Sequence, residues 1–378
     1  VPLKIGGLHF QLRRFGVDAM ICVLHVRRMK AITFQDVETL AYEDVAEPSI
    51  EEATDVIVRV TTAGLCGSDL HPYFGRETGL DVGTVMGHEM VGEVLEVGGE
   101  VTDFVVGDRV VAPFTTSCGA CFYCRAGLTA RCERSQLFGW VQDGVGLHGC
   151  QADYVRVPIA DGTLVRVPEG LDEAVALLAG DILSTATFGA ELARVGSGDT
   201  VVVVGCGPVG LLGIRAAFER GAACVIAVDN VPSRLAVAEA FGAQPANFAE
   251  EDPSEIVRGF TDGRGADSAI EAVGSPEATR AAADLLRLGG TLAAVGVHAE
   301  PHLALSPGEI YDRNLTYSGG RCPARHYMPA SLALAVRDEA LIGTLISHRL
   351  PLSDGIDAYR SFAARESGWT KVVLHPTD

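Results

Sequence analysis

The sequence is poor in aromatic residues and in positive charge. Aromatic side chains make up 6% of its 378 residues, and 30 lysines and arginines stand against 49 acidic residues, giving a formal net charge of −19. A surface this acidic repels phosphate backbones, so nucleic acid is not an expected partner. Runs of about 20 uninterrupted apolar residues are also lacking, which predicts no membrane span and no membrane partner.

The chain is longer than one hydrophobic core usually requires, so two domains are expected. Its first 28 residues are basic, and two interpretations are open: a targeting peptide, or an extension ahead of a natural start at Met29. The second is favoured, because a strand pattern begins at residues 30–34.

The pattern of apolar residues changes near Leu171. Before it, short apolar or alternating runs at 56–60, 91–97 and 108–111 predict a compact, β-rich, barrel-like domain. After it, helical and strand patterns alternate, which is typical of a doubly wound parallel sheet with helices on both faces. The expected helices are 173–192, 210–220 and 233–241, and the expected strands are 200–204, 225–229, 267–271 and 291–295. The tail from about Leu315 has mixed character and could return to the first domain.

A glycine motif follows the buried strand at 200–204. Gly205, Gly207 and Gly210 form G-x-G-x-x-G, with Pro208 and Val209 before the last glycine. Placed between a strand and a helix, this pattern predicts a dinucleotide site, with the pyrophosphate at the helix N-terminus.

The next strand ends in Asp229, where a carboxylate can accept hydrogen bonds from both ribose hydroxyls and repel a 2′-phosphate. NAD is therefore expected rather than NADP. Arg234 argues weakly in the other direction, for NADP, because an arginine can pair with that phosphate.

Four of the ten cysteines fall within fifteen residues, at Cys118, Cys121, Cys124 and Cys132. Four thiolates this close can surround one tetrahedral Zn²⁺ in a closed, structural site. An iron–sulfur cluster and disulfides are the competing interpretations, although the spacing differs from the ferredoxin run. The clustering of the four cysteines favours a metal site, in a protein of the reducing cytoplasm.

A second set of candidate ligands is dispersed. It comprises Cys66, Ser68, Asp69 and His71 in one segment, and His88 and Glu89 after Gly87 in another. Neither segment is specific alone. Combined with the four cysteines and the glycine motif, the two segments become specific. On these motifs the chain resembles the zinc-containing medium-chain dehydrogenase/reductase family of alcohol dehydrogenase type, over about residues 30–375.

The resemblance implies a catalytic zinc held by Cys66, His88 and Asp181. Many members have a cysteine at the third place, and some that are similar to formaldehyde dehydrogenase have an aspartate. It further implies that Ser68 takes the alcohol proton and His71 passes it out through the ribose. Asp69 and Glu89 match carboxylates that orient ligands or transiently bind the metal. The alternative for Asp69 and Asp181 is an ordinary helix cap.

Further residues match cofactor and pocket positions of the family. Phe114 and Trp140 resemble substrate-pocket walls, although both could be core. Strand ends at Val273, Val295 and Val297 resemble backbone contacts to the cofactor, and Lys371 is expected to reach the pyrophosphate. An arginine that does this in some members is replaced here by Gly67.

The expected organisation is an extension at 1–28, a GroES-like catalytic domain at 29–181 and 315–378 with a zinc lobe at 113–134, and a Rossmann NAD-binding domain at 182–314. The expected protein is a cytoplasmic, zinc-dependent, NAD-linked alcohol dehydrogenase with two Zn²⁺ per chain, acting on a small alcohol or aldehyde. The resemblance suggests a homodimer or homotetramer. A formaldehyde dehydrogenase or dismutase and a polyol dehydrogenase stay open, and a zinc-free quinone reductase or a non-catalytic binding protein is disfavoured by the intact ligands.

Overall fold

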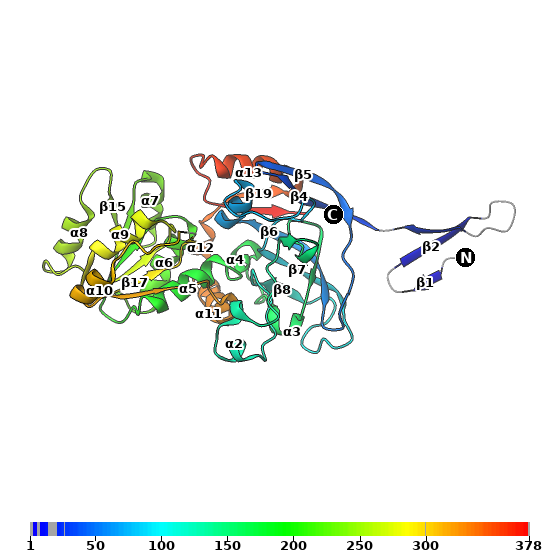
Figure 1. The fold of residues 1–378 in the computed structure, drawn as a ribbon, viewed down its shortest axis with the longest axis horizontal. Coiled ribbons are helices and arrows are strands. Elements are labelled where there is room, and N and C mark those ends of the chain that lie inside the picture. The colour runs from blue at the N-terminus through cyan, green and yellow to red at the C-terminus, as the bar shows by residue number, and fades with distance from the viewer. Residues whose placement is uncertain (1–2, 6–7, 14–20, 26, 299, 377–378) are drawn as a thin grey trace.

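The structure is a computed structural model that describes residues 3–5, 8–13, 21–25, 27–298 and 300–376. Two units lie side by side in Figure 1, a β-rich unit in the middle of the view and an α/β unit to its left. Strands β1 (Leu3–Ile5), β2 (Leu8–Arg13) and β3 (Ile21–His25) form a sheet of their own. The expected extension at 1–28 therefore falls partly on residues outside the described ones.

The main sheet of the β-rich unit has the order β12-β8-β7-β6-β20-β19, with β11 also pairing with β6. Its strands are β6 (Val56–Leu65), β7 (Met90–Val97), β8 (Arg109–Ala112), β11 (Tyr154–Val157), β12 (Val165–Arg166), β19 (Ile346–Pro351) and β20 (Lys371–His375). Strand β20, near the end of the chain, pairs with β6 and carries β19 at its other edge, so the tail contributes two strands to this sheet.

Smaller elements surround this sheet. Two hairpins pair β4 (Arg28–Asp36) with β5 (Thr39–Ala46) and β9 (Trp140–Gln142) with β10 (Val145–Leu147). The helices are α1 (Leu70–Tyr73), α2 (Phe122–Arg125), α3 (Ala160–Thr163), α4 (Glu173–Leu178), α11 (Ala324–Arg337), α12 (Glu339–Gly343) and α13 (Gly355–Ala363). Short 3₁₀ turns occur at η1 (Gly67–Asp69), η2 (Thr129–Arg131) and η3 (Leu352–Asp354).

The α/β unit contains the predicted doubly wound parallel sheet, in the order β15-β14-β13-β16-β17-β18. Its strands are β13 (Thr200–Val204), β14 (Cys224–Asp229), β15 (Gln244–Asn247), β16 (Ala266–Glu271), β17 (Leu286–Ala294) and β18 (Thr316–Gly319). Its helices are α5 (Ile182–Leu192), α6 (Pro208–Glu219), α7 (Pro232–Ala240), α8 (Pro253–Phe260), α9 (Pro276–Asp284) and α10 (Pro307–Arg313). Central strand β13 is buried throughout, which explains its run of valines.

Three expected boundaries differ from the structure. The single helix expected at 173–192 is two helices, α4 and α5, because the chain turns at residues 179–181 and a Cβ at Gly180 would collide with the carbonyl of Ala112. Strand β17 begins before Gly289 and Gly290, and its register with β16 shifts ahead of Thr291. Strand β18 pairs with β17, so the parallel sheet extends past the expected domain boundary at residue 314.

One hydrophobic core continues from the β-rich unit into the α/β unit. It joins Val91 and Val111 of the first sheet, the buried faces of α4 and α5, and Val201 and Val203 of β13. Helix α5 packs directly against α6. Among the described helices, none combines the length and the hydrophobicity needed to cross a bilayer.

Candidate functional site

Three side chains from separate segments meet between the two units. Cys66 follows β6, His88 precedes β7, and Asp181 precedes α5. Their ligand atoms all lie within 4.8 Å of one another. Cys66 Sγ is 3.3 Å from Asp181 Oδ2, and His88 Nε2 is 3.5 Å from the same oxygen. A thiolate, an imidazole and a carboxylate arranged in this way can hold one Zn²⁺ and leave a position for an exchangeable ligand.

Asp69 orients the two ligands nearest to it. One carboxylate oxygen lies 3.0 Å from His88 Nδ1, and the other accepts the amide of Cys66 at 2.9 Å. These contacts fit the expected ligand-orienting carboxylate. The alternative, an ordinary N-cap, does not fit, because Asp69 is the N-cap residue of α1 but makes no side-chain capping bond there, and its bond to Cys66 closes the capping box of η1. Bonding at Nδ1 fixes the imidazole so that Nε2 faces Cys66 and Asp181.

Asp181 occupies the N-cap position of α5, yet its side chain makes no capping hydrogen bond there. Its carboxylate instead faces Cys66 and His88, with Thr185 Oγ1 3.5 Å from Oδ1. An ordinary cap would accept the amides of the first helical turn, as Asp172 does for α4. The observed direction fits a ligand.

The charges around the three side chains are strongly coupled. Burial raises the pKa of the Cys66 thiol, and the Asp181 carboxylate adds to that rise. Burial opposes protonation of His88, but Asp69 and Asp181 outweigh it and hold its pKa well above the ordinary histidine value. The pocket of negative charge that keeps a proton on His88 would equally attract a divalent cation.

Glu89 and Lys371 form a buried ion pair behind this group. Lys371 Nζ also donates to the carbonyl of Leu65 at 3.2 Å, and its side chain is 1% exposed. The expectation that Lys371 reaches a pyrophosphate is therefore not what the structure has, because the pairing of β20 with β6 directs it inward. Gly64 leaves room for this pair, since a Cβ there would collide with Glu89 Oε2 and displace that side chain.

A buried carboxylate oxygen without a partner supports the presence of a metal ion at this place. Glu89 Oε1 is buried and has no hydrogen-bond partner among the described groups. A buried carboxylate oxygen without a partner is costly, and a nearby cation would offset that cost. The donor set of Cys66, His88 and Asp181, backed by this oxygen, therefore fits the predicted zinc.

Ser68 lies at the edge of the same group. Its hydroxyl is 3.3 Å from Cys66 Sγ and 3.2 Å from His88 Nε2. His71 lies on α1, one turn further along the chain. The structure thus brings Ser68 to the metal ligands, and the expected relay from Ser68 to His71 stays a prediction.

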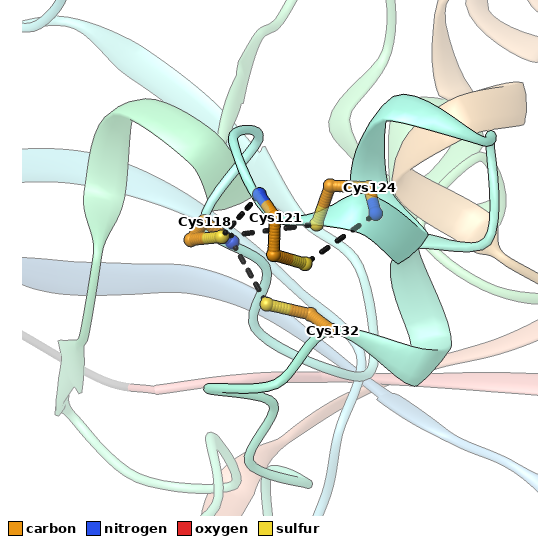
Figure 2. Close-up of side chains that lie close together, drawn as sticks. All are labelled: Cys118, Cys121, Cys124 and Cys132. Atoms are coloured by element: carbon orange, nitrogen blue, oxygen red, sulfur yellow. Dashed lines mark hydrogen bonds between the residues drawn. The ribbon is translucent and has the colours of Figure 1, made fainter.

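The four clustered cysteines converge in a lobe formed around α2 and η2. Figure 2 shows Cys118, Cys121, Cys124 and Cys132 with their sulfurs directed toward one another. All four sulfurs lie within 4.8 Å of each other, and the Sγ atoms of Cys118 and Cys124 are 4.0 Å apart. Tetrahedral ZnS₄ with bonds of about 2.3 Å requires sulfurs roughly 3.8 Å apart, so the spacing fits one zinc.

Backbone amides favour the thiolate form of Cys118 and Cys121, whereas burial raises the pKa of Cys124 and of Cys132. Cys118 Sγ accepts the amide of Cys121 at 3.3 Å, and Cys132 Sγ accepts the amide of Cys118 at 3.2 Å. The amide of Cys124 lowers the pKa of Cys121 to about 6. All the cysteines whose side chains are described are free thiols, which disfavours the disulfide interpretation.

The glycine motif forms the turn between β13 and α6. Gly205 has a φ of +92°, and a Cβ at Gly210 would collide with the Gly205 carbonyl. Helix α6 begins at Pro208, so its free amides face the turn. Asp229 ends the adjacent strand β14, where its carboxylate accepts the amide of Cys206 at 2.7 Å.

The remaining expected contacts are distributed along both units. The Phe114 ring lies edge-on to the His88 ring, with 6.5 Å between ring centres. This places Phe114 beside Cys66, His88 and Asp181, which together are called the metal group. Trp140 lies in the β9–β10 hairpin opposite Leu147. Val273 and Val297 are exposed beside the carboxyl ends of β16 and β17, the edge where a dinucleotide lies in such sheets.

Several residues near the site were not anticipated. Phe188 follows Asp181 by two helical turns and packs with Tyr327 and Cys322 against Phe114. Helical spacing from Asp181 could have indicated Phe188, since residues seven apart share a face. Glu271 and His298 form a pair at the end of β16. An acidic residue ending an apolar strand was the available signal for Glu271.

Comparisons with known proteins identify two family domains in the chain. Residues 52–169 match the alcohol dehydrogenase GroES-like domain, and residues 208–337 match the zinc-binding dehydrogenase domain. Zinc-type alcohol dehydrogenase B of Aspergillus flavus is 43% identical, covering 89% of this chain and 79% of its own.

Solved structures give the same result. Alcohol dehydrogenase TADH from Thermus sp. ATN1 is 38% identical with a TM-score of 0.88, covering 92% of this chain and 100% of its own. A zinc-binding dehydrogenase from Sinorhizobium meliloti, bound to NADP, is 28% identical with a TM-score of 0.81, covering 93% and 100%. The chain therefore belongs to the zinc-dependent medium-chain dehydrogenase family and is an oxidoreductase of its alcohol dehydrogenase branch.

Proposed function

We propose that this protein is a zinc-dependent, NAD-linked dehydrogenase that oxidises an alcohol to an aldehyde or ketone. The observation that carries the proposal is the meeting of Cys66, His88 and Asp181 between the two units. Two of these ligands come from the β-rich unit, and the third begins a helix that packs on the first cofactor-binding helix. A substrate at this place would lie within reach of a cofactor on the parallel sheet.

The chemistry divides between cofactors and protein. A Zn²⁺ held by the three ligands supplies a Lewis acid that lowers the pKa of an alcohol hydroxyl, and NAD supplies the hydride acceptor. Ser68 Oγ, next to Cys66 and His88, is positioned to accept the alcohol proton. Asp69 holds His88 in place, and the Phe114 ring excludes water from one side of the metal group.

Preference for NAD follows from Asp229. Its side chain is 8% exposed and lies against the glycine turn, so a 2′-phosphate at the end of β14 would meet a buried negative charge. Arg234 Nη1 is 3.9 Å from Asp229 Oδ2, and this ion pair draws the guanidinium toward the carboxylate.

The surroundings of the metal group favour a compact apolar alcohol over a polyol. Phe114, Phe188, Cys322, Ala324 and Tyr327 form an apolar cluster, which Leu137, Leu192 and Val295 extend. Tyr327 donates its hydroxyl to Glu191 at 3.0 Å, which leaves the ring as the surface that faces the cluster. A polyol would need hydrogen-bonding partners for several hydroxyls, and burying them against these side chains would be costly.

The test is turnover by the purified protein, with zinc counted by mass spectrometry. We expect NADH production from benzyl alcohol and butanol, weaker turnover of sorbitol, and slower reaction with NADP. Asp181→Ala is expected to abolish turnover while NADH binding survives, because that carboxylate contacts Cys66, His88 and Thr185 and not the glycine turn. The matched control is Asp172→Ala, which removes a carboxylate that does cap a helix. Loss of NADH binding in Asp181→Ala, or turnover without metal, would refute the assignment.

A further inference from the structure

A buried carboxylate lies at the centre of the cofactor-binding sheet. Glu271 ends β16 and pairs with Val204, the last residue of β13. Strands β14 and β15 extend the sheet to one side of β13, and β16, β17 and β18 extend it to the other. The crevice where dinucleotides bind in such sheets opens at this reversal of strand order. Glu271 therefore lies directly beneath the expected cofactor.

The carboxylate of Glu271 is fully buried and has partners on both oxygens. Oε1 accepts the amides of Val273 and Gly274, each at 2.7 Å. Oε2 lies 3.0 Å from His298 Nε2. Because a carboxylate can only accept, the His298 imidazole carries the proton on Nε2. His298 supplies the one side-chain donor in this set.

The pair fastens two loops together. Glu271 precedes the loop at 272–275, and His298 lies in the loop that follows β17. The loops interlock, because a Cβ at Gly274 would collide with the backbone of Val297 and a Cβ at Gly296 with the backbone of Gly274. The carbonyl of Glu271 also accepts the amide of Val295 at 2.9 Å.

These loops carry the side chains that face the crevice. Val273 is 54% exposed and Val297 49% exposed, unusual values for valines that follow buried strands. The Val273 side chain also covers Gly205, where a Cβ would collide with it. The shape of the loops thus sets both the apolar floor of the crevice and the clearance at the first glycine of the turn.

We propose that His298 is a positioning residue for the nicotinamide cofactor, acting through Glu271 on the loops that carry Val273 and Val297. This inference rests on the proposed function, because it presumes that a nicotinamide dinucleotide occupies the crevice. His298 holds the Glu271 carboxylate in place, so that the two amides stay directed at Oε1 and the crevice keeps the shape that binds the cofactor.

The experiment compares His298→Ala, His298→Phe and His298→Gln in the full-length, zinc-loaded protein. Phenylalanine keeps the ring and removes the donor, whereas glutamine restores an N–H donor. The matched control is His302→Ala, an exposed histidine in the same connection. The measurements are the Kd for NADH by fluorescence titration, and the KM for NAD together with kcat.

We expect Ala and Phe to weaken NADH binding about tenfold, since a hydrogen bond to a charged group contributes roughly that factor. His298→Gln should recover part of the lost affinity, and the control His302→Ala should bind NADH as tightly as the wild type. The KM for NAD should rise while kcat at saturating NAD stays near wild type, because the metal group is untouched. A general folding defect would lower zinc content and kcat as well, and would overturn the proposal.

The two levels of inference fail in different ways. Wild-type protein that binds neither NADH nor NADPH would refute the proposed function itself. Wild-type protein that binds NADH, with His298→Ala and His298→Phe binding equally well, would refute only the role of His298. Failure of glutamine to recover any binding would also count against the donor role.

Discussion

The Nδ1 atom of His88 lies 3.0 Å from a carboxylate oxygen of Asp69, so the metal-facing nitrogen of the ring is the other one. We expect Asp69→Asn to weaken zinc binding at Cys66, His88 and Asp181 by about 10- to 100-fold, the usual cost of losing such a partner. The side-chain carbonyl oxygen of the asparagine can still accept the hydrogen bond from the Cys66 backbone N–H, so the local turn should persist. Competition with a chromogenic chelator measures the change, and unaltered zinc release would contradict it. NADH binding serves as the control.

The buried pair of Glu89 and Lys371 makes stability sensitive to single changes. Glu89→Gln or Lys371→Met leaves an uncompensated buried charge, and we expect each to lower the free energy of unfolding by about 3–5 kcal/mol. The double variant should be more stable than either single variant, since no charge is left unpaired. Urea denaturation checks this, with the exposed pair Arg360 and Asp357 as the control, where changes should stay within about 0.5 kcal/mol. Additive losses in the double variant would argue against the pair.

Cofactor choice should depend on Asp229. Removing its carboxylate in Asp229→Gly frees Arg234 for a 2′-phosphate and removes two ribose acceptors, so the ratio of kcat/KM for NAD over NADP should fall by at least about tenfold. Adding Arg234→Ala should then lower kcat/KM for NADP. An unchanged ratio in the single variant would exclude Asp229 from ribose recognition.

The four-cysteine lobe should hold zinc for structure alone. Cys121→Ser removes a ligand, and we expect one zinc per chain to be lost and the Tm to fall, with NADH affinity retained because the glycine turn belongs to the other unit. Cys224→Ser, at the start of β14 and outside both metal groups, should keep its full zinc content. Retention of zinc in Cys121→Ser would favour a different occupant of the lobe.

Features that depend on neighbouring residues in the chain were predictable from the sequence. The glycine turn and the four cysteines each occupy a short segment, so spacing alone gave their geometry. The parallel sheet followed from strand and helix patterns. Asp181 was reached only through family resemblance, because its meeting with Cys66 and His88 depends on packing between the units.

Other features depend on contacts between distant segments. The apolar pattern of 173–192 is continuous, and it does not indicate that Gly180 lies against the carbonyl of Ala112, where a Cβ would collide. Lys371 is directed to Glu89 by the pairing of β20 with β6, which no local pattern indicates. The bond between His298 and Glu271 likewise joins the ends of two strands whose adjacency the sequence does not state.

The turn between α4 and α5 gives the metal group a mechanical property. Cys66 and His88 are fixed to the β-rich sheet, whereas Asp181 begins the helix that packs on α6 of the other unit. A zinc ion bound by all three residues would therefore link the two units. Any rotation of the α/β unit that carried α5 with it would change the distances from Asp181 to Cys66 and His88. The strength of zinc binding would then depend on how far the crevice between the units is open, and bound zinc would in turn favour one separation of the units.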